Sequence, residues 1–186
     1  MKFFYMYGNI GTHKSTYARY IADRQGTLIL DDDELYHVLC NKSWKFYYNK
    51  GIQEVVLQMF QGAVSKLQEN AVKDAVVATA SLDPFMFSLD IKPPNQLFII
   101  VTGNGTREFS LENRRKNHRG VSQEEWAMVY DQEAAKIRTG LASLKETLED
   151  KTWLAETVLW LTDPLDEELS KKEIDKFLDN VYNVQN

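Results

Sequence analysis

The 186-residue sequence contains a single cysteine, Cys40. One cysteine excludes an internal disulfide and the paired-cysteine motifs of zinc and redox sites, so we expect a reducing, cytoplasmic setting. No apolar run approaches the length of a membrane span, and the N-terminus lacks a signal-peptide pattern. The net charge of −5 argues against a surface coated in basic residues for duplex DNA, but it is compatible with one local basic groove.

The sequence also lacks internal repeats, low-complexity segments and linkers rich in proline, glycine and serine. Its composition, 44% hydrophobic and 26% charged, is that of an ordinary globular protein. A chain of 186 residues can form one domain with a proper core. We therefore predict a single domain over residues 1–186, with a helical C-terminal part from about 123 to 186.

Short apolar segments alternate with amphipathic ones along the chain. Strands are predicted at 2–7, 27–30, 75–79, 96–101 and 157–161. Helices are predicted at 15–24, 51–70, 110–118, 123–149 and 165–182, with Gly140 as a candidate break. This alternation is typical of the α/β class, with a mostly parallel sheet of about five strands and helices on both faces. In such folds the site lies beyond the carboxyl ends of the strands, which brings together residues 8–15, 31–34, 79–81 and the segment after Val101.

The stretch after the first predicted strand is close to the phosphate-binding pattern G-x-x-x-x-G-K-[ST]. It reads Gly8-Asn9-Ile10-Gly11-Thr12-His13-Lys14-Ser15-Thr16. In such a loop main-chain N–H groups and a helix N-terminus bind phosphates, the lysine reaches the outer phosphates, and the serine hydroxyl binds Mg²⁺. Gly8, Lys14 and Ser15 keep the spacing, and His13 stands at the second glycine. We therefore predict an ATP site with Ser15 as the Mg²⁺ ligand.

Two other interpretations of this stretch stay open. One is an ordinary strand-to-helix turn. The other is a dinucleotide site, but Gly8-x-x-Gly11 differs from G-x-G-x-x-G, and the Lys-Ser-Thr triplet has no role in such a site.

Phosphoryl transfer also needs a carboxylate that takes the proton of the acceptor hydroxyl, and cations over the transferring group. The candidate carboxylates are Asp31, Asp32 and Asp33, which directly follow the second predicted strand. A solvated helix start is the alternative, because the helix dipole favours acids there. The candidate cations are Arg114, Arg115, Lys116 and Arg119, in a predicted lid over about 107–122, and the alternative is a solvated helix face.

Taken together, these motifs resemble the bacteriophage polynucleotide 5′-kinase family, within the larger group of P-loop kinases. The family opens with GxPGSGKST, where this chain has residues 8–16. Its acidic motif N-x-D-D-x-R is replaced here by Asp31-Asp32-Asp33-Glu34-Leu35-Tyr36. Its lid resembles Asn113-Arg114-Arg115-Lys116 followed by residues 121–130. The similarity spans about residues 3 to 135.

This resemblance implies a phage-type, cytoplasmic kinase that uses ATP and Mg²⁺ and phosphorylates a hydroxyl of a nucleic acid or nucleotide, with no membrane partner. It implies Lys14, Asp33 and Arg115 as catalytic residues, with Asp33 as the general base. The implied ATP-binding residues are Gly8, Asn9, Gly11, Thr12, His13, Lys14, Ser15, Thr16, Arg114 and Arg119, and Ser15 is the implied metal ligand.

The chain departs from the family chiefly on the acceptor side. Tyr36 stands where the family has an arginine for the acceptor phosphate, and Thr79 stands where it usually has an aspartate. This pattern is also compatible with a small-molecule nucleoside or nucleotide kinase, or with a nucleotide-binding module without transfer activity. On the donor side, we expect His13 to tune nucleotide binding rather than to abolish it.

Overall fold

The structure is a computed structural model that describes residues 2–31, 55, 58, 59, 62, 66, 74–79, 97–117, 122–150 and 157–183. Its strands are β1 (Lys2–Gly8), β2 (Leu28–Asp31), β3 (Asp74–Thr79), β4 (Leu97–Gly103) and β5 (Val158–Trp160). Its helices are α1 (Lys14–Gln25), α5 (Arg107–Asn117), α6 (Gln123–Asp150) and α7 (Glu167–Asn183). No helix in this part of the chain is long and apolar enough to span a membrane.

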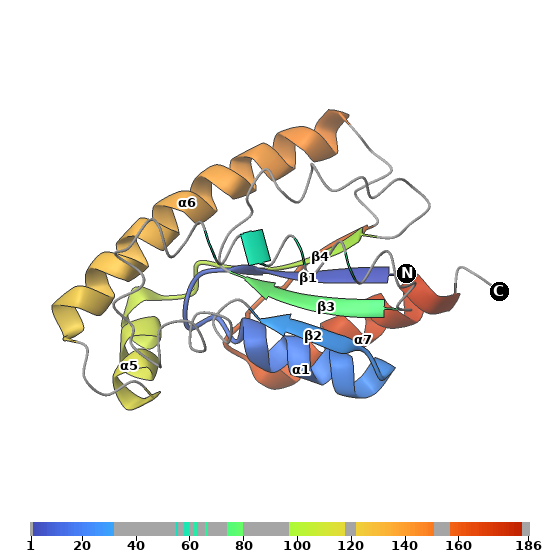
Figure 1. The fold of residues 1–186 in the computed structure, drawn as a ribbon, viewed down its shortest axis with the longest axis horizontal. Helices are drawn as coiled ribbons and strands as arrows, with labels where there is room; N and C mark the ends of the chain where they lie inside the picture. The colour runs from blue at the N-terminus through green and yellow to red at the C-terminus, as the bar shows by residue number, and fades with distance from the viewer. Residues whose placement is uncertain are drawn as a thin grey trace.

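The five strands form one sheet in the order β2-β3-β1-β4-β5, and every pair is parallel (Figure 1). This confirms the predicted α/β fold with a sheet of about five parallel strands. β1 is the central strand, and its Tyr7 is in register with Thr79 of β3 and Val101 of β4. Because all strands run the same way, their carboxyl ends meet at one edge of the sheet.

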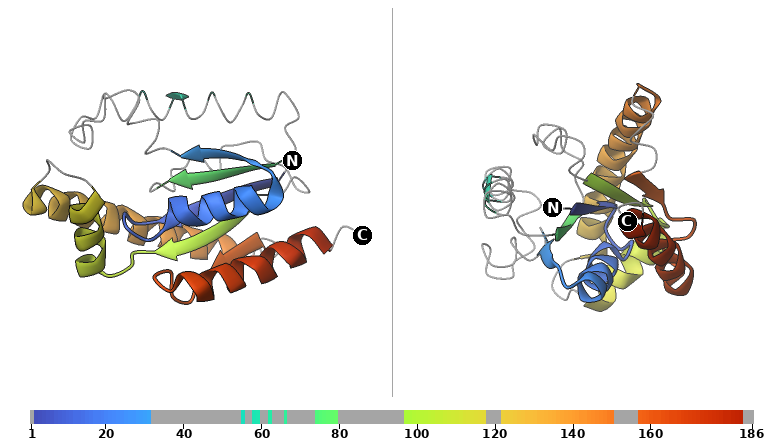
Figure 2. Two further views of the ribbon diagram at one scale, coloured as in Figure 1. Left: turned by 90° about the horizontal axis from the view of Figure 1, so that it is seen from below. Right: turned by 90° about the vertical axis from the view of Figure 1, so that its right-hand side faces the viewer.

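β1 is buried along its whole length because helices cover both faces of the sheet. Phe4 and Met6 belong to the hydrophobic core formed with α1 and α7. On the other face, the Tyr7 hydroxyl donates a hydrogen bond to the Ile137 carbonyl of α6, at 3.3 Å. Figure 2 shows the same layers, with α1 and α7 on one side of the sheet and α6 on the other. Because both faces of β1 are covered, its residues do not alternate between apolar and polar.

Two helix boundaries lie at the predicted capping residues. Gly26 ends α1 in the left-handed region at φ 63, and its N–H donates to the Ala22 carbonyl. Ser122 and Glu125 form the capping box of α6: the Ser122 N–H donates to Glu125 Oε2 at 2.8 Å, and the Glu125 N–H donates to Ser122 Oγ at 3.1 Å.

The predicted break of α6 at Gly140 is wrong, because the helix runs unbroken from Gln123 to Asp150. Ile137 and Leu144, on either side of Gly140, are both almost completely buried. A glycine inside a helix costs only about 1 kcal/mol, and burial of two large side chains outweighs that cost.

The remaining predicted elements are found within about three residues of their expected bounds. α5 begins at Arg107 rather than Ser110, because the Thr106 hydroxyl accepts a hydrogen bond from the Phe109 N–H at 3.3 Å and caps the helix. For the helix predicted at 51–70, the described positions 55, 58, 59, 62 and 66 are all helical. The rest of that helix, and residues 32–34 of the acidic run, lie outside the described residues.

Candidate nucleotide site

The loop between β1 and α1 starts at a position that admits only glycine. A Cβ on Gly8 would overlap Thr102 Oγ1 and lie 2.7 Å from the Gly103 carbonyl oxygen. The Thr102 hydroxyl donates to the Tyr7 carbonyl at 3.2 Å and lies 2.7 Å from the Thr12 hydroxyl. The end of β4 therefore packs directly against the loop.

Two loop residues have positive φ angles, Gly11 at 74° and His13 at 59°. His13 is the N-cap of α1 and stands where the phosphate-binding pattern has its second glycine. The left-handed conformation costs a residue with a Cβ about 1–2 kcal/mol, although histidine is enriched there among non-glycine residues. The one departure from the pattern thus occurs where the backbone favours glycine, and the histidine keeps the loop conformation at some strain.

The His13 ring lies between α5 and α7. Its Nδ1 is 3.5 Å from Glu167 Oε1 at the start of α7. Its ring centroid is 5.6 Å from that of Phe109 on α5 and 6.0 Å from that of Tyr17. The ring therefore joins the N-terminus of α1 to both neighbouring helices.

Lys14 lies across the loop, and its Nζ donates to the Asn9 carbonyl oxygen at 2.6 Å. The N-terminus of α1 has no side-chain cap and no acidic residue in its first turn. By contrast, α5, α6 and α7 each have at least one acid there. A lysine at the positive end of a helix dipole is unfavourable unless an anion is bound. The arrangement, with Ser15 in the first turn beside Lys14, therefore fits the phosphates of a nucleotide and their Mg²⁺.

Asn9 is completely buried, and its side chain is directed at the β4–α5 turn and at α6. Its Nδ2 donates to Asn104 Oδ1 at 3.2 Å and to the Tyr130 carbonyl at 3.4 Å, and its Oδ1 accepts from the Ile10 N–H at 2.7 Å. Its own N–H donates to the Gly103 carbonyl at 2.7 Å. The predicted nucleotide residue Asn9 thus holds the loop to the rest of the fold.

The helices α5 and α6 pack directly on the loop. Ile10 is buried in a cluster with Trp126, Val129, Tyr130 and Ala134 of α6, with Leu111 of α5 beside it. A Cβ on Gly11 would lie 2.8 Å from the Cα of Ser110. The Ser110 hydroxyl is buried there and has no hydrogen-bond partner among the described residues.

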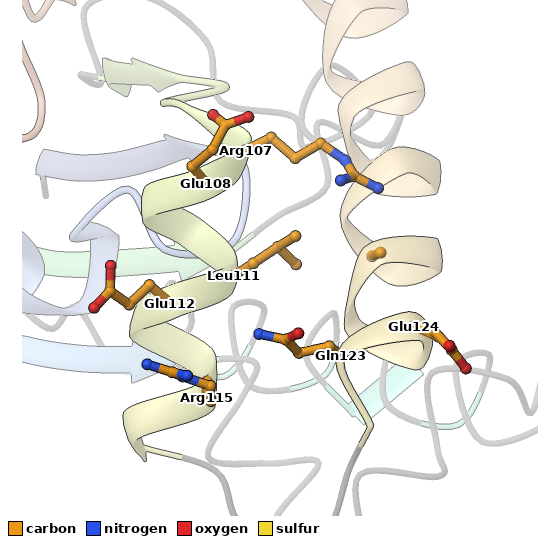
Figure 3. Close-up of a pocket in the computed structure, with 8 residues that line it drawn as sticks. Arg107, Glu108, Leu111, Glu112, Arg115, Gln123 and Glu124 are labelled. Carbon is orange, nitrogen blue, oxygen red and sulfur yellow. The ribbon is translucent and has the colours of Figure 1, made fainter.

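The predicted lid arginines have different surroundings. Arg114 is only 9% exposed, and its guanidinium lies 5.1 Å from the centroid of the Trp126 ring, a cation–π contact. Arg115 is exposed and lines a 480 Å³ cavity between α5 and α6 (Figure 3). Arg119 lies outside the described residues. The structure therefore places Arg114 in the contact between the two helices and Arg115 at their surface.

Arg107, at the start of α5, reaches toward α6 in Figure 3. It donates from Nε and Nη2 to the two carboxylate oxygens of Asp131, at 2.9 and 3.0 Å. These hydrogen bonds, together with the positive charge of Arg107, hold the pKa of the Asp131 carboxyl below its usual range. Arg107 thus ties α5 to α6.

Of the predicted acidic run, the structure describes Asp31, the last residue of β2, which is 7% exposed and in register with Ala78. Asp33, the predicted general base, lies outside the described residues, as does Tyr36. No cluster of three or more acidic, histidine or cysteine side chains that would suit a metal is present in the described ranges. The predicted metal ligand Ser15 lies in the first turn of α1.

Sequence reasoning missed three of the residues that shape the loop: Thr102, Asn104 and Tyr130. Thr102 and Asn104 follow the apolar residues of β4, at the edge of the sheet where the site is predicted. This position in the sequence could have identified them as site residues. Tyr130 lies 121 residues from Asn9 in the sequence, and nothing in the local pattern links the two.

No protein-family model and no curated protein sequence matches this chain. Its fold matches a sugar kinase from Janibacter sp. HTCC2649, with a TM-score of 0.61 and 17% identity over 96% of this chain and 95% of that chain. It matches a deoxyadenosine kinase from M. mycoides, with a TM-score of 0.57 and 12% identity over 97% and 99%. It also matches a chain of the Pnkp1/Rnl/Hen1 RNA repair complex, with a TM-score of 0.56 and 15% identity over 76% and 45%. The chain therefore has the fold of the P-loop kinases.

Proposed function

We propose that this protein is an ATP-dependent phosphotransferase of the polynucleotide kinase type, which moves the γ-phosphate of ATP to a hydroxyl of a nucleic acid or nucleotide. The observation that carries the proposal is the loop at the carboxyl end of β1. There, Lys14 lies across the main chain at the N-terminus of α1, which has no side-chain cap and no acidic residue in its own first turn. The fold and the resemblance to phage kinases support the same assignment.

In this proposal Lys14 exchanges the Asn9 carbonyl for phosphate oxygens of ATP. A charged phosphate oxygen is a stronger acceptor for an ammonium group than a neutral carbonyl. The Ser15 hydroxyl would hold Mg²⁺, which would neutralise charge on the transferring phosphoryl group. The N–H groups of the loop and of the first turn of α1 would bind the remaining phosphate oxygens.

Asp33 is the proposed general base, which takes the proton of the acceptor hydroxyl. The acceptor oxygen attacks the γ-phosphorus, the bond from that phosphorus to the β–γ bridging oxygen breaks, and ADP leaves. Asp31 supports this assignment because it ends β2 at the same edge of the sheet as the loop. Asp33 follows Asp31 by two residues in the sequence. Arg115 and Arg119 are the proposed cations over the transferring phosphate.

The proposed acceptor is a nucleic acid or nucleotide hydroxyl, and the acceptor side of the site is the part that differs most from phage kinases. Thr79, at the end of β3 beside Tyr7, supplies no charge where those kinases usually have an aspartate. The similar solved structures include kinases of a sugar and a deoxynucleoside. The acceptors tested should therefore extend beyond polynucleotide ends.

The test is incubation with ATP labelled at the γ-phosphate and a panel of acceptors. The panel contains DNA and RNA with 5′-hydroxyl ends, DNA with hydroxymethylated bases, nucleosides and nucleoside monophosphates. The proposal predicts a labelled product with at least one nucleic acid or nucleotide. ATP binding without a labelled product from any acceptor would identify a nucleotide-binding module instead.

A further inference from the structure

The side chain of Asn9 links the phosphate loop to α6. Both hydrogens of its amide point at acceptors on other elements, Asn104 Oδ1 in the β4–α5 turn and the Tyr130 carbonyl in α6. The main-chain oxygen of the same residue accepts hydrogen bonds from Lys14 Nζ at 2.6 Å and from the Thr12 hydroxyl at 2.7 Å. A buried amide that lost these partners would be costly, so the position of the loop is bound to the positions of its neighbours.

Tyr130 completes this link from the other side. Its hydroxyl donates toward the Asn104 carbonyl at 3.0 Å and toward the Gly105 carbonyl at 3.4 Å. Gly105 has a φ of 59°, and a Cβ there would lie 2.9 Å from Thr12 Cγ2. The turn, the loop and α6 are therefore held together by hydrogen bonds from the side chains of Asn9 and Tyr130.

The geometry points to Asn9 and Tyr130 as positioning residues that couple phosphate binding in the loop to the α5–α6 pair. The coupling rests on the proposed function, since its ligand is ATP. When Lys14 turns from the Asn9 carbonyl to a phosphate, that carbonyl loses the hydrogen bond from the ammonium group and keeps the one from the Thr12 hydroxyl. The amide of Asn9 then holds the carbonyl in place and transmits any shift of the loop to Asn104 and Tyr130. The α5–α6 pair carries the proposed phosphate ligand Arg115.

The α5–α6 pair does not depend on Asn9 for its own assembly. Arg107 and Asp131 join the two helices through two hydrogen bonds at the surface. Leu111 of α5 packs on the apolar cluster of α6. Loss of the Asn9 and Tyr130 contacts should therefore leave the pair assembled but no longer coupled to the loop.

The experiment compares Asn9→Ala, Tyr130→Phe, the double variant and Asp131→Asn with the wild type. Tyr130→Phe removes only the hydroxyl and keeps the ring in its cluster, and thermal denaturation checks that each variant is folded. ATP affinity is measured by calorimetry in the presence of Mg²⁺. Amide hydrogen exchange is measured over residues 123–130 with and without ATP.

We expect each single variant to bind ATP about 5-fold more weakly, as the loss of a buried hydrogen bond implies. We expect the double variant to be less impaired than the product of the single effects, because both residues act through one network. In the wild type ATP should slow exchange over 123–130, and in the variants this effect should disappear. Asp131→Asn removes the carboxylate charge of the α5–α6 ion pair and leaves the hydrogen bonds of Asn9 and Tyr130 in place, so it should bind ATP within about 2-fold of the wild type.

ATP affinities equal to the wild type in Asn9→Ala and Tyr130→Phe, with protection over 123–130 retained, would overturn the coupling while leaving the proposed function intact. The coupling would also be overturned if Asp131→Asn weakened ATP binding as much as they do, because the effect would then be one of general helix packing. A wild-type protein that binds no ATP would overturn the proposed function and the coupling together.

Discussion

The ammonium group of Lys14 donates a hydrogen bond to the main-chain oxygen of Asn9 across the β1–α1 loop, at 2.6 Å. The loop thus supplies an acceptor for a positive charge that the N-terminus of α1 disfavours. We predict that Lys14→Ala lowers ATP affinity by roughly 10–100-fold, the effect of losing a hydrogen bond to a charged group. Calorimetry would measure it, with Lys172→Ala, an exposed lysine of α7, as the control. Equal ATP affinity in wild type and Lys14→Ala would contradict this role.

His13 combines a strained backbone with contacts to α5 and α7, and two substitutions separate these effects. His13→Ala keeps the Cβ at φ 59° and removes the ring, whereas His13→Gly also relieves the strain. We predict that the glycine variant is more stable than the alanine variant by about 1 kcal/mol in urea denaturation.

The His13→Gly variant also tests whether His13 changes ATP affinity only modestly. ATP affinity of His13→Gly should stay within about 10-fold of the wild type, because the loop conformation is kept. A much larger gain in affinity or rate would show that histidine impairs the loop.

Gly11 is predicted to tolerate substitution poorly. In Gly11→Ala the new Cβ would lie 2.8 Å from Ser110 Cα, in addition to the cost of a φ of 74°. The matched control is Gly26→Ala, at φ 63° with no atom within 4 Å of the new Cβ. We expect about 1–2 kcal/mol of destabilisation in the control and roughly 1–3 kcal/mol more in Gly11→Ala. Equal urea midpoints for the two variants would show that α5 does not press on the loop.

The ion pair between Arg107 and Asp131 gives the α5–α6 contact a pH dependence. Hydrogen bonds from Arg107 lower the pKa of Asp131 from its ordinary value of 3.8. Because the folded-state pKa is the lower one, the pair stabilises the fold above about pH 3.8 and loses this effect as the pH falls through the folded-state pKa. An NMR titration should place the Asp131 midpoint below 3.8 in the wild type and move it upward in Arg107→Ala. An unchanged midpoint would mean that the two side chains do not pair in solution.

Asp33 is predicted to act in the chemical step alone. Asp33→Asn keeps the size of the side chain but removes its basicity, so transfer should slow by roughly 10²–10⁴-fold. Calorimetry should find ATP affinity within about 2-fold of the wild type, because the loop is unchanged. Retained turnover in Asp33→Asn would transfer the role of the base to another residue.

The parts of the fold that depend on local patterns were predictable from the sequence. The Ser122–Glu125 capping box, the Gly26 helix end and the strand–loop–helix at Gly8–Ser15 each involve residues close in the chain, and all three are present. The continuity of α6 through Gly140 was not predictable, because burial of Ile137 and Leu144 decides it. Tertiary packing overrides a weak local preference there.

The surroundings of the site residues were harder to predict for the same reason. The contact of Arg114 with Trp126 and the hydrogen bonds of Asn9 to Asn104 and Tyr130 join segments that are distant in sequence or lie on different helices. A charged helix face looks the same in the sequence whether an arginine meets solvent, a phosphate or an aromatic ring. Only the docking of α5 and α6 onto the loop distinguishes these cases.

Transfer of label from ATP to an acceptor tests the proposed phosphotransferase activity most directly. The wild type and Lys14→Ala are incubated with the acceptor panel and with ATP labelled at either the γ- or the α-phosphate. We expect a labelled nucleic acid or nucleotide from γ-labelled ATP and none from α-labelled ATP, with the product strongly reduced in Lys14→Ala. No labelled product from the wild type with any acceptor, or equal product from the wild type and Lys14→Ala, would contradict the proposed activity.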